Sequence, residues 1–207
     1  MMSCKSDEAL RISSLTPFTR RCHPSGIGVD DLSCRFSPII ASTGLRDICV
    51  LVKEESVLWG LAVDFPAMSA LSEEIDVVGV HMGAMASRIN NIPVRNFAPK
   101  CGIDEESATG TSNCAMACAL AAEGLLTWGG EYTFVQEDEM GAPSRIIVRL
   151  GEGKHDAAWV GGKFRVVIEE GETSPLFASA KYSHFNFVLD FPSRTSPPKP
   201  NVASTPY

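Results

Sequence analysis

The hydrophobic pattern along the chain changes at Pro38. Before it, residues 1–37 show weak periodicity and several Pro and Gly breakers, which predicts an irregular segment. After it, runs of apolar and β-branched residues indicate strands. These runs cover residues 47–53, 57–63, 77–82, 92–97, 132–136, 145–150 and 158–169. The last run contains Gly161 and Gly162, which predict a bulge or a tight bend.

Two other segments have helical character. Asp64 stands where it can cap a short helix, with Pro66 in the first turn and an apolar face of Met68, Leu71 and Ile75. The second helix, predicted over residues 111–126, is apolar nearly all round, and Glu123 is its sole charge. A surface helix carries one polar face, so this helix is expected to be enclosed by other elements.

The order of these elements predicts the fold class. Strands precede the short helix, further strands follow it, and the enclosed helix stands before the last strands. The economical arrangement is an α+β fold, in which a mostly antiparallel sheet wraps around one buried central helix. Strict alternation of strand and helix is lacking, which argues against a Rossmann fold.

The chain divides into three predicted parts. Residues 1–37 form the irregular N-terminal segment, and residues 38–170 form the lobe built on the enclosed helix. Residues 171–207 form an extension, and its last part, 193–207, is rich in Ser, Pro and Thr and is predicted to be disordered.

Composition and charge exclude several function classes. The 207 residues are 44% hydrophobic and carry a net charge of −7, which argues against a nucleic-acid partner. No apolar run reaches the roughly 18 residues of a membrane span, and the polar N-terminus lacks a signal core, so a cytoplasmic location is expected. The seven cysteines show no framework spacing and are expected to be free thiols.

The segment that leads into the enclosed helix carries the candidate chemistry. Gly110 permits a tight turn, and Thr111 or Ser112 is expected to cap the helix. The first N–H groups of a helix have no internal partner and, with the helix dipole, favour an anion. Three carboxylates, Asp104, Glu105 and Glu106, stand just upstream and are suited to proton transfer. The plainer interpretation is that this acidic run only compensates the dipole.

Other candidates have weaker support. Arg95 is placed either to bind a substrate carboxylate or to form a surface ion pair. His81 lies in an apolar strand, which is typical of a satisfied core or cleft histidine. Cys114 and Cys118 lie one helical turn apart without a histidine, so they are expected to be core residues, and no metal site is predicted.

Several motifs in one order point to a known family. The stretch from Asn96-Phe-Ala-Pro99 through Gly102-Ile-Asp-Glu-Glu-Ser-Ala-Thr-Gly-Thr-Ser-Asn113 resembles the signature of the PhzF-like (phenazine biosynthesis-like) isomerases. Ser42-Thr-Gly-Leu-Arg-Asp47 looks like the entry to one of that family's strands. Its C-terminal strands are similar to Gln136-Glu, Met140-Gly, Pro143-Ser and Val160-Gly-Gly162. The resemblance covers roughly residues 38–170 and matches the C-terminal lobe.

The resemblance implies a diaminopimelate-epimerase-like fold and isomerase chemistry without a metal or cofactor. In this family two lobes flank the active site. Glu106 falls on the active-site carboxylate of the C-terminal lobe, and Gly110 and Thr111 fall on a pair that binds substrate. Thr109 stands where related epimerases carry a catalytic Cys, which argues against racemisation by two thiols.

The chain departs from the family in one important respect. The family's principal proton-transferring Glu belongs to an N-terminal lobe, and about 37 residues precede the matched region here. The leading hypothesis is an isomerase that moves a proton on a small carboxylate-bearing metabolite. Glu106 would assist catalysis, and Arg95, Thr109, Gly110, Thr111 and Ser112 would bind the substrate. A homodimer or a second lobe would complete the site. The alternative is a non-catalytic lobe that serves as a binding or oligomerisation module.

Overall fold

The structure is a computed structural model that describes residues 2–3, 23–85, 91–136, 143–154, 156–164 and 185–188. The strands are β1 (Met2–Ser3), β2 (Ile39–Ser42), β3 (Arg46–Val52), β4 (Gly79–Ala84), β5 (Ile92–Ala98), β6 (Ile103–Glu106), β7 (Glu131–Gln136), β8 (Ser144–Arg149), β9 (Ala157–Phe164) and β10 (Phe185–Val188). The helices are α2 (Glu55–Trp59), α3 (Phe65–Glu74) and α4 (Gly110–Ala122). The described residues also form the 3₁₀ turns η1 (His23–Ser25), η2 (Val29–Asp31) and η3 (Pro99–Cys101).

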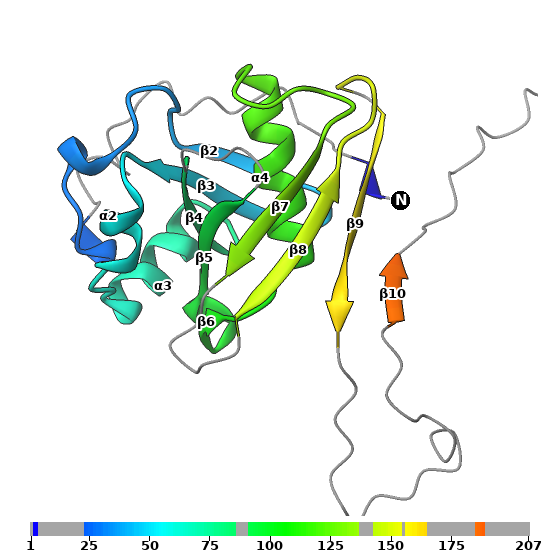
Figure 1. Cartoon of the computed structure of the whole chain (residues 1–207). Coiled ribbons are helices and arrows are strands. Elements are labelled where there is room, and N and C mark those ends of the chain that lie inside the picture. Colours follow the sequence, from blue (N-terminus) through cyan, green and yellow to red (C-terminus); the bar gives the residue numbers. More distant parts are fainter. Residues whose placement is uncertain are drawn as a thin grey trace, which may run out of the picture.

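The described strands belong to one mixed sheet (Figure 1). Its order is β1-β9-β8-β7-β5-β4-β3-β2, with β10 paired to β9 and β6 paired to β5. The pairings β3–β4 and β5–β7 are parallel. Every other pairing among the described strands is antiparallel, which confirms the mostly antiparallel sheet.

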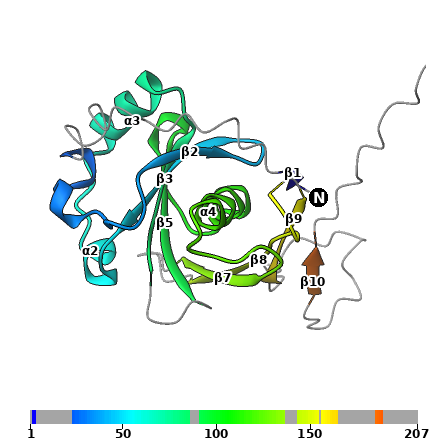
Figure 2. The same ribbon diagram turned by 90° about the horizontal axis from the view of Figure 1, so that it is seen from above.

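The sheet curls around α4. Strands β2 and β9 lie far apart in the strand order, yet both contact the helix, and Figure 2 shows α4 inside the curl. Each residue from Ser112 to Ala121 is buried. A helix that is apolar on all sides has no face for water, so the strands close around it. The predicted fold class is confirmed.

The end of α4 falls earlier than the pattern predicts. Gly124 has a φ of 73° and its N–H donates to the Ala121 carbonyl, while the Leu125 N–H donates to the Leu120 carbonyl. This pair of bonds around a left-handed glycine is a Schellman motif, which ends the helix at Ala122. The apolar residues up to Leu126 then pack on the core without being helical.

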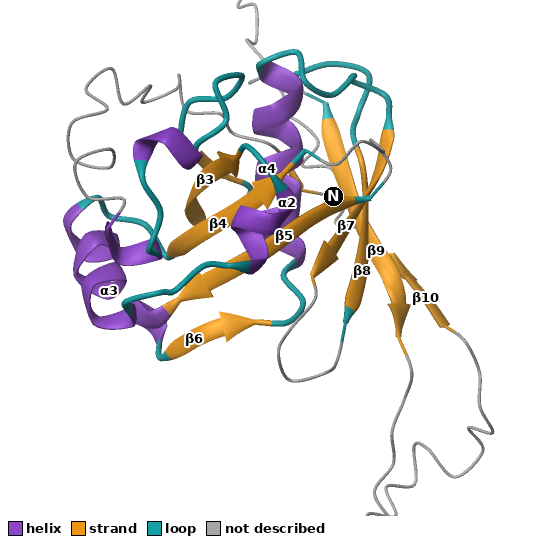
Figure 3. Cartoon of the chain, turned by 60° about the vertical axis from the view of Figure 1, so that its left-hand side comes forward, coloured by secondary structure: helices purple, strands orange, loops and turns teal. Residues whose placement is uncertain are grey.

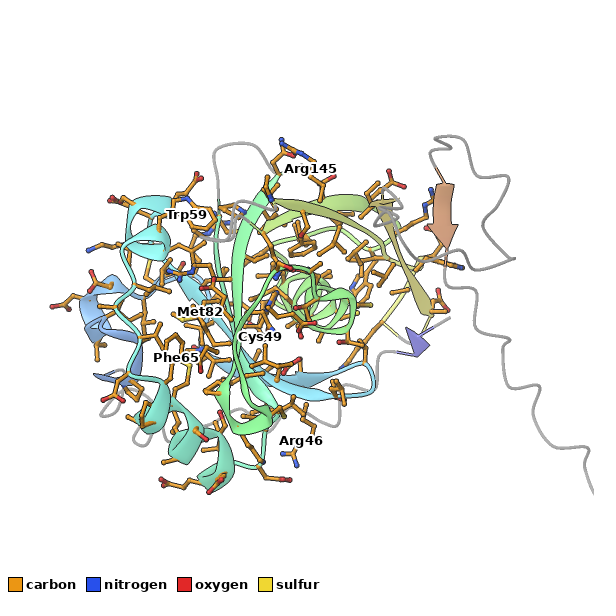
Figure 4. The ribbon with its side chains drawn as sticks, turned by 90° about the horizontal axis from the view of Figure 1, so that it is seen from below. Arg46, Cys49, Trp59, Phe65, Met82 and Arg145 are labelled. Carbon is orange, nitrogen blue, oxygen red and sulfur yellow. The ribbon has the colours of Figure 1, made fainter. Side chains whose placement is uncertain are left out.

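Two apolar clusters lie on opposite faces of β3, β4 and β5. In β3, Cys49 and Leu51 face the inner cluster around α4, whereas Ile48, Val50 and Val52 face an outer cluster. The helices α2 and α3 cover the outer cluster, and Figure 4 shows Phe65 and Met82 on that side of the sheet and Cys49 towards α4. A strand buried on both faces explains why residues 47–53 are almost continuously apolar.

The strand predicted at residues 57–63 is wrong. Residues 55–59 form the short helix α2, and an extended loop leads from it to α3. Leu58 is fully buried, and Val57 and Trp59 pack on the outer cluster. Short apolar runs suit a strand and a covering helix equally well, and Gly60 stops this helix after five residues.

The bulge or bend predicted at Gly161 and Gly162 is also wrong. Both residues stay in regular register with β8, where Gly161 faces Ile147 and Gly162 faces Ile146. A Cβ atom on Gly162 would lie 3.1 Å from the Arg145 carbonyl oxygen. Close approach of two backbones therefore accounts for this glycine.

The remaining predicted elements agree with the structure within a few residues. Asp64 caps α3 by accepting a 3.0 Å hydrogen bond from the Ala67 N–H, and Met68 and Leu71 are buried. In the N-terminal segment, Ile27 joins the outer cluster and Phe36 joins the inner one. Residues 165–169, the end of the last predicted strand, lie outside the described residues. The tail at 193–207, which was predicted to be disordered, also lies outside them. In the part of the chain that is described, no helix has the length and apolarity to cross a bilayer.

Enlarging a side chain inside the curl should be costly. Ala117 is fully buried in the middle of α4, and Ala122 is exposed at its end. We expect Ala117→Leu to lower the free energy of unfolding by about 1–3 kcal/mol, because the enclosing strands cannot move away together. Ala122→Leu on the same helix should change it by no more than about 0.5 kcal/mol. Urea denaturation measures both, and equal effects would contradict the enclosure of α4.

Candidate functional site

The start of α4 presents free backbone donors. Thr109 is the N-cap residue, with extended dihedrals and no side-chain bond to the first turn. Neither Thr111 nor Ser112 caps the helix, so that prediction is wrong; both residues lie within its first turn. No acceptor among the described residues meets the N–H groups of Gly110, Thr111 and Ser112. Gly110 and Thr111 are half-buried, so the positive end of the helix reaches the surface there.

Strand β6 brings Glu106 to this helix end. The acidic run forms a strand along β5, as Figure 3 shows, and Asn96 of β5 pairs with Glu106. The Thr109 hydroxyl donates to Glu106 Oε2 over 2.9 Å, and Asn96 Nδ2 lies 3.3 Å from the same oxygen. Within the described part of the chain, Glu106 Oε1 has no hydrogen-bond partner. One carboxylate oxygen is therefore anchored and the other is available.

Arg95 is not brought to this site. Successive residues of a strand point to opposite faces, so Arg95 and Glu105 lie on the face of the sheet opposite to Asn96 and Glu106. Arg95 Nε and Nη2 each donate to a Glu105 oxygen over 2.7 Å, and Nη1 donates to the Leu58 carbonyl over 3.3 Å. Its side chain is 7% exposed and its guanidinium stands 5.0 Å from the Phe97 ring centre. The ion pair that was one alternative for Arg95 exists, but it is largely buried.

Two buried amide side chains, Gln136 and Asn113, form a polar network behind Glu106. Gln136 Oε1 accepts from the Thr109 N–H over 2.9 Å and from Asn113 Nδ2 over 3.0 Å, and Gln136 Nε2 donates to the Glu106 carbonyl over 2.7 Å. Asn113 Nδ2 also donates to the Thr109 carbonyl over 2.7 Å. The network joins α4 to β7 and fixes the backbone on both sides of the turn.

His81 continues this network towards β5. Its Nε2 lies 3.1 Å from Asn113 Oδ1, and its Nδ1 lies 3.0 Å from Asn96 Oδ1. Burial lowers the pKa of His81 to about 4, against the favourable effect of its two amide partners. His81 is thus a satisfied core histidine, as its position in an apolar strand predicts.

Asp47 was missed by the sequence analysis. It is 2% exposed on β3 and accepts a 2.7 Å hydrogen bond from the Ser112 hydroxyl. Burial raises the pKa of the Asp47 carboxyl, and the charge of Glu106 adds to the rise, while bonds from Ser112 and the Gly79 N–H oppose it. An acidic residue opening the apolar run at 47–53 was the available signal. Its proximity to a helix 65 residues later was not visible in the sequence.

The predicted binding residues therefore divide into two groups. Gly110 and Thr111 face the surface with unused N–H groups, whereas Thr109 and Ser112 are buried and bonded to carboxylates. Thr43 supports the turn by donating from its hydroxyl to the Thr111 carbonyl over 2.9 Å. The arrangement offers backbone donors for a negative charge beside a carboxylate that can exchange a proton.

Metal-binding side chains do not cluster in the part of the chain that the structure describes. Cys114 and Cys118 are buried inside the curl, where they pack as small apolar residues. Cys49 is buried in β3, Cys34 and Cys101 are exposed, and Cys4 and Cys22 lie outside the described residues.

The fold places the chain among the α+β proteins in which a curled sheet encloses one helix, and the site lies at the open end of that helix. A sequence model of the phenazine biosynthesis-like proteins (PhzC-PhzF) matches residues 16–170. The chain therefore belongs to the phenazine biosynthesis-like family.

Curated relatives and solved structures agree with this assignment. An uncharacterized isomerase of Deinococcus radiodurans is 35% identical over 113 residues, which are 53% of this chain and 36% of that protein. The uncharacterized isomerase YddE of Salmonella typhimurium is 29% identical over 97 residues, or 47% of this chain and 33% of its own. The chain thus spans about a third of the length of these relatives.

Two solved structures show the same fold. A PhzF-family protein of Bacillus anthracis superposes with a TM-score of 0.57 at 21% identity, and the matched region covers 65% of this chain and 47% of that protein. A predicted epimerase of Pseudomonas aeruginosa superposes with a TM-score of 0.52 at 21% identity, and the matched region covers 64% of this chain and 44% of that protein.

The buried state of His81 predicts a pH-dependent stability. Unfolded His81 takes up a proton below its ordinary pKa of 6.5, whereas folded His81 resists protonation down to about 4. Because the unfolded state then binds more protons, the stabilising effect of neutral His81 is present above pH 6.5 and is lost as the pH falls towards 4. The loss amounts to about 3 kcal/mol.

Comparison with His81→Gln isolates this effect, because glutamine does not titrate and keeps an amide for Asn113. Urea denaturation of both proteins across this pH range should show the wild-type protein losing free energy of unfolding relative to the variant. A constant difference between the two proteins would show that His81 is not buried in its neutral form.

Proposed function

We propose that this chain forms one half of the active site of an isomerase, which moves a proton between carbon atoms of a small carboxylate-bearing metabolite. The observation that carries this proposal is the available Oε1 of Glu106 beside the start of α4, where no described residue accepts from the first N–H groups. Membership of a family whose curated relatives are called isomerases supports the reaction class.

Gly110 and Thr111 take the substrate carboxylate in this proposal. Their N–H groups point out of the positive end of α4, and such groups stabilise both a carboxylate and the negative charge that develops when a neighbouring carbon loses a proton. Both donors are uncharged backbone N–H groups. The chemistry proposed requires no metal or cofactor.

Glu106 exchanges the proton with the substrate carbon. Its anchored oxygen, held by Thr109, sets the direction of the carboxyl group, and its second oxygen faces the substrate. Thr109 is a positioning residue in this proposal, because a Thr hydroxyl is too weak an acid to take over proton transfer from a thiol. Ser112 positions the helix turn through Asp47, since both side chains are buried and used up in their mutual bond.

A second lobe or a second copy of the chain supplies the other acid in this proposal. The chain covers about a third of its curated relatives and under half of the two solved structures. We place the substrate between the start of α4 and that partner, in a cytoplasmic setting and without a role for nucleic acid or membrane.

Replacing Glu106 should abolish proton exchange. We expect the 207-residue chain in heavy water to introduce deuterium into members of a panel of amino acids and unsaturated hydroxy acids, as followed by mass spectrometry. Glu106→Gln should slow this exchange by about 100-fold or more, because the amide cannot carry the proton. Asp104→Asn is the matched control, since Asp104 is exposed on the same strand.

Two outcomes would count against the enzymatic role. Equal exchange by Glu106→Gln and the control would remove Glu106 from the reaction. No exchange by the unaltered chain, at concentrations where it self-associates, would instead favour a binding or oligomerisation lobe.

The backbone donors can be tested separately at Gly110. Proline fits the first position of a helix and removes one N–H, while alanine keeps that N–H and adds a similar Cβ atom. Thr109 before it is extended, which suits a following proline. We expect Gly110→Pro to bind acetate or pyruvate about tenfold more weakly than Gly110→Ala, because a hydrogen bond to a charged group is lost. Isothermal titration calorimetry measures both, and equal affinities would exclude this N–H from binding.

A further inference from the structure

The strand that carries Glu106 has an irregular register. Among the described strands β6 pairs with β5 and no other, through Asn96 with Glu106 and through Ala98 with Ile103. The step between the two paired residues covers two positions on β5 but three on β6. One residue of β6 is therefore extra, and strands use such a β-bulge to change the face to which a side chain points.

The bulge decides which glutamate reaches the start of α4. In a regular antiparallel ladder that continued from the first pair of β6, Glu105 would stand opposite Asn96. Glu106 would then stand opposite Arg95, on the other face of the sheet. With the bulge, Glu106 is opposite Asn96 instead and accepts a hydrogen bond from the Thr109 hydroxyl. Glu106 thus belongs to the site because of one extra residue in β6.

Glu105 holds Arg95 on the far face of the sheet in this arrangement. Glu105 Oε1 accepts from Arg95 Nε, and Oε2 accepts from Nη2, each over 2.7 Å. The Arg95 side chain is 7% exposed, its guanidinium lies 5.0 Å from the Phe97 ring centre, and Nη1 donates to the Leu58 carbonyl. A guanidinium fixed in this buried position is costly when its carboxylate is removed, because a charge is left poorly compensated.

We propose that Glu105 is a positioning residue, which holds Arg95 so that Arg95 does not draw Glu106 out of the site. The proposal rests on the function proposed for Glu106 and deepens it, because it explains how one of two adjacent glutamates is kept for the reaction. Without the Glu105 carboxylate, the regular ladder would give Arg95 a new partner in Glu106.

The bonds that oppose such a shift join neutral groups. Gln136 Nε2 donates to the Glu106 carbonyl over 2.7 Å, and the Ser144 hydroxyl donates to the Ser107 carbonyl. These bonds hold the end of β6 in the bulged register. A bidentate pair between a guanidinium and a carboxylate is stronger than bonds of this kind, so an Arg95 that has lost Glu105 should prevail over them.

The register of β6 can be read without a substrate. Cross-strand nuclear Overhauser contacts of the Asn96 backbone protons show whether position 106 or position 105 stands opposite. We expect Glu105→Gln to gain the contact between Asn96 and position 105, because Arg95 then attracts Glu106. Asp104→Asn is the matched control, since Asp104 is exposed on the same strand, and it should keep the wild-type contact. A wild-type register in Glu105→Gln would overturn the proposal.

Removing the cation as well should restore the register. Arg95→Met combined with Glu105→Gln takes away both charges of a buried pair, which proteins tolerate better than the loss of one partner. We expect this double variant to show the wild-type contact between Asn96 and Glu106. A shifted contact that persists in it would show that Arg95 does not draw Glu106.

A second double variant keeps the test decisive if Glu105→Gln does not fold. Arg95→Lys with Glu105→Gln retains a cation, and the flexible lysine stem lets its charge stay partly hydrated. This variant should show the shifted contact, whereas the variant with Arg95→Met should not. Identical registers in the two double variants would overturn the proposal.

The isomerase assay separates this proposal from the function on which it rests. Glu105→Gln should slow deuterium incorporation by about 100-fold, as Glu106→Gln does, and the double variant with Arg95→Met should recover to within about threefold of the wild type. An inactive wild-type chain would count against the proposed function, while the register would still decide the role of Glu105. A shifted register with an unchanged exchange rate would overturn the positioning role.

Discussion

The absence of a polar face on α4 is the constraint on which the rest of the structure depends. A helix of this kind cannot lie on a surface, and its Ala and Cys side chains allow strands to approach from every side. The sheet therefore curls until β2 and β9 both reach the helix. Because the helix is enclosed on its sides, only its ends reach solvent. The N–H groups of Gly110 and Thr111 lie at one of these ends, and no described residue accepts a hydrogen bond from them.

The polar network behind the turn follows from the same enclosure. Asn113 lies in the first turns of a helix that is apolar elsewhere, and a buried amide without partners would cost about 1–3 kcal/mol. Gln136 and His81 supply those partners, and their bonds tie the helix to β7 and β4. A rigid support of this kind holds Glu106 in one position beside the helix end, which a loop alone would not do.

The sequence predicted the enclosed helix and the fold class because both follow from composition and spacing within one segment. It failed at residues 57–63, where a short apolar run covers the sheet from outside instead of pairing with it. The sequence also assigned Arg95 to the same site as Glu106, although Arg95 pairs with Glu105 on the other face of the sheet. Alternation along a strand shows which residues share a face, but not which face meets the helix. The contact between Asp47 and Ser112 depends on the closed curl, so no local pattern contained it.

The central claim is that α4 is closed on its sides and open at its first turn. Amide hydrogen exchange, followed by NMR, tests this most directly. The account predicts that the N–H groups of Gly110 and Thr111 exchange orders of magnitude faster than those of Cys114 to Leu120, and that acetate slows them. Protection of the first turn equal to that of the helix interior, unchanged by acetate, would contradict the account.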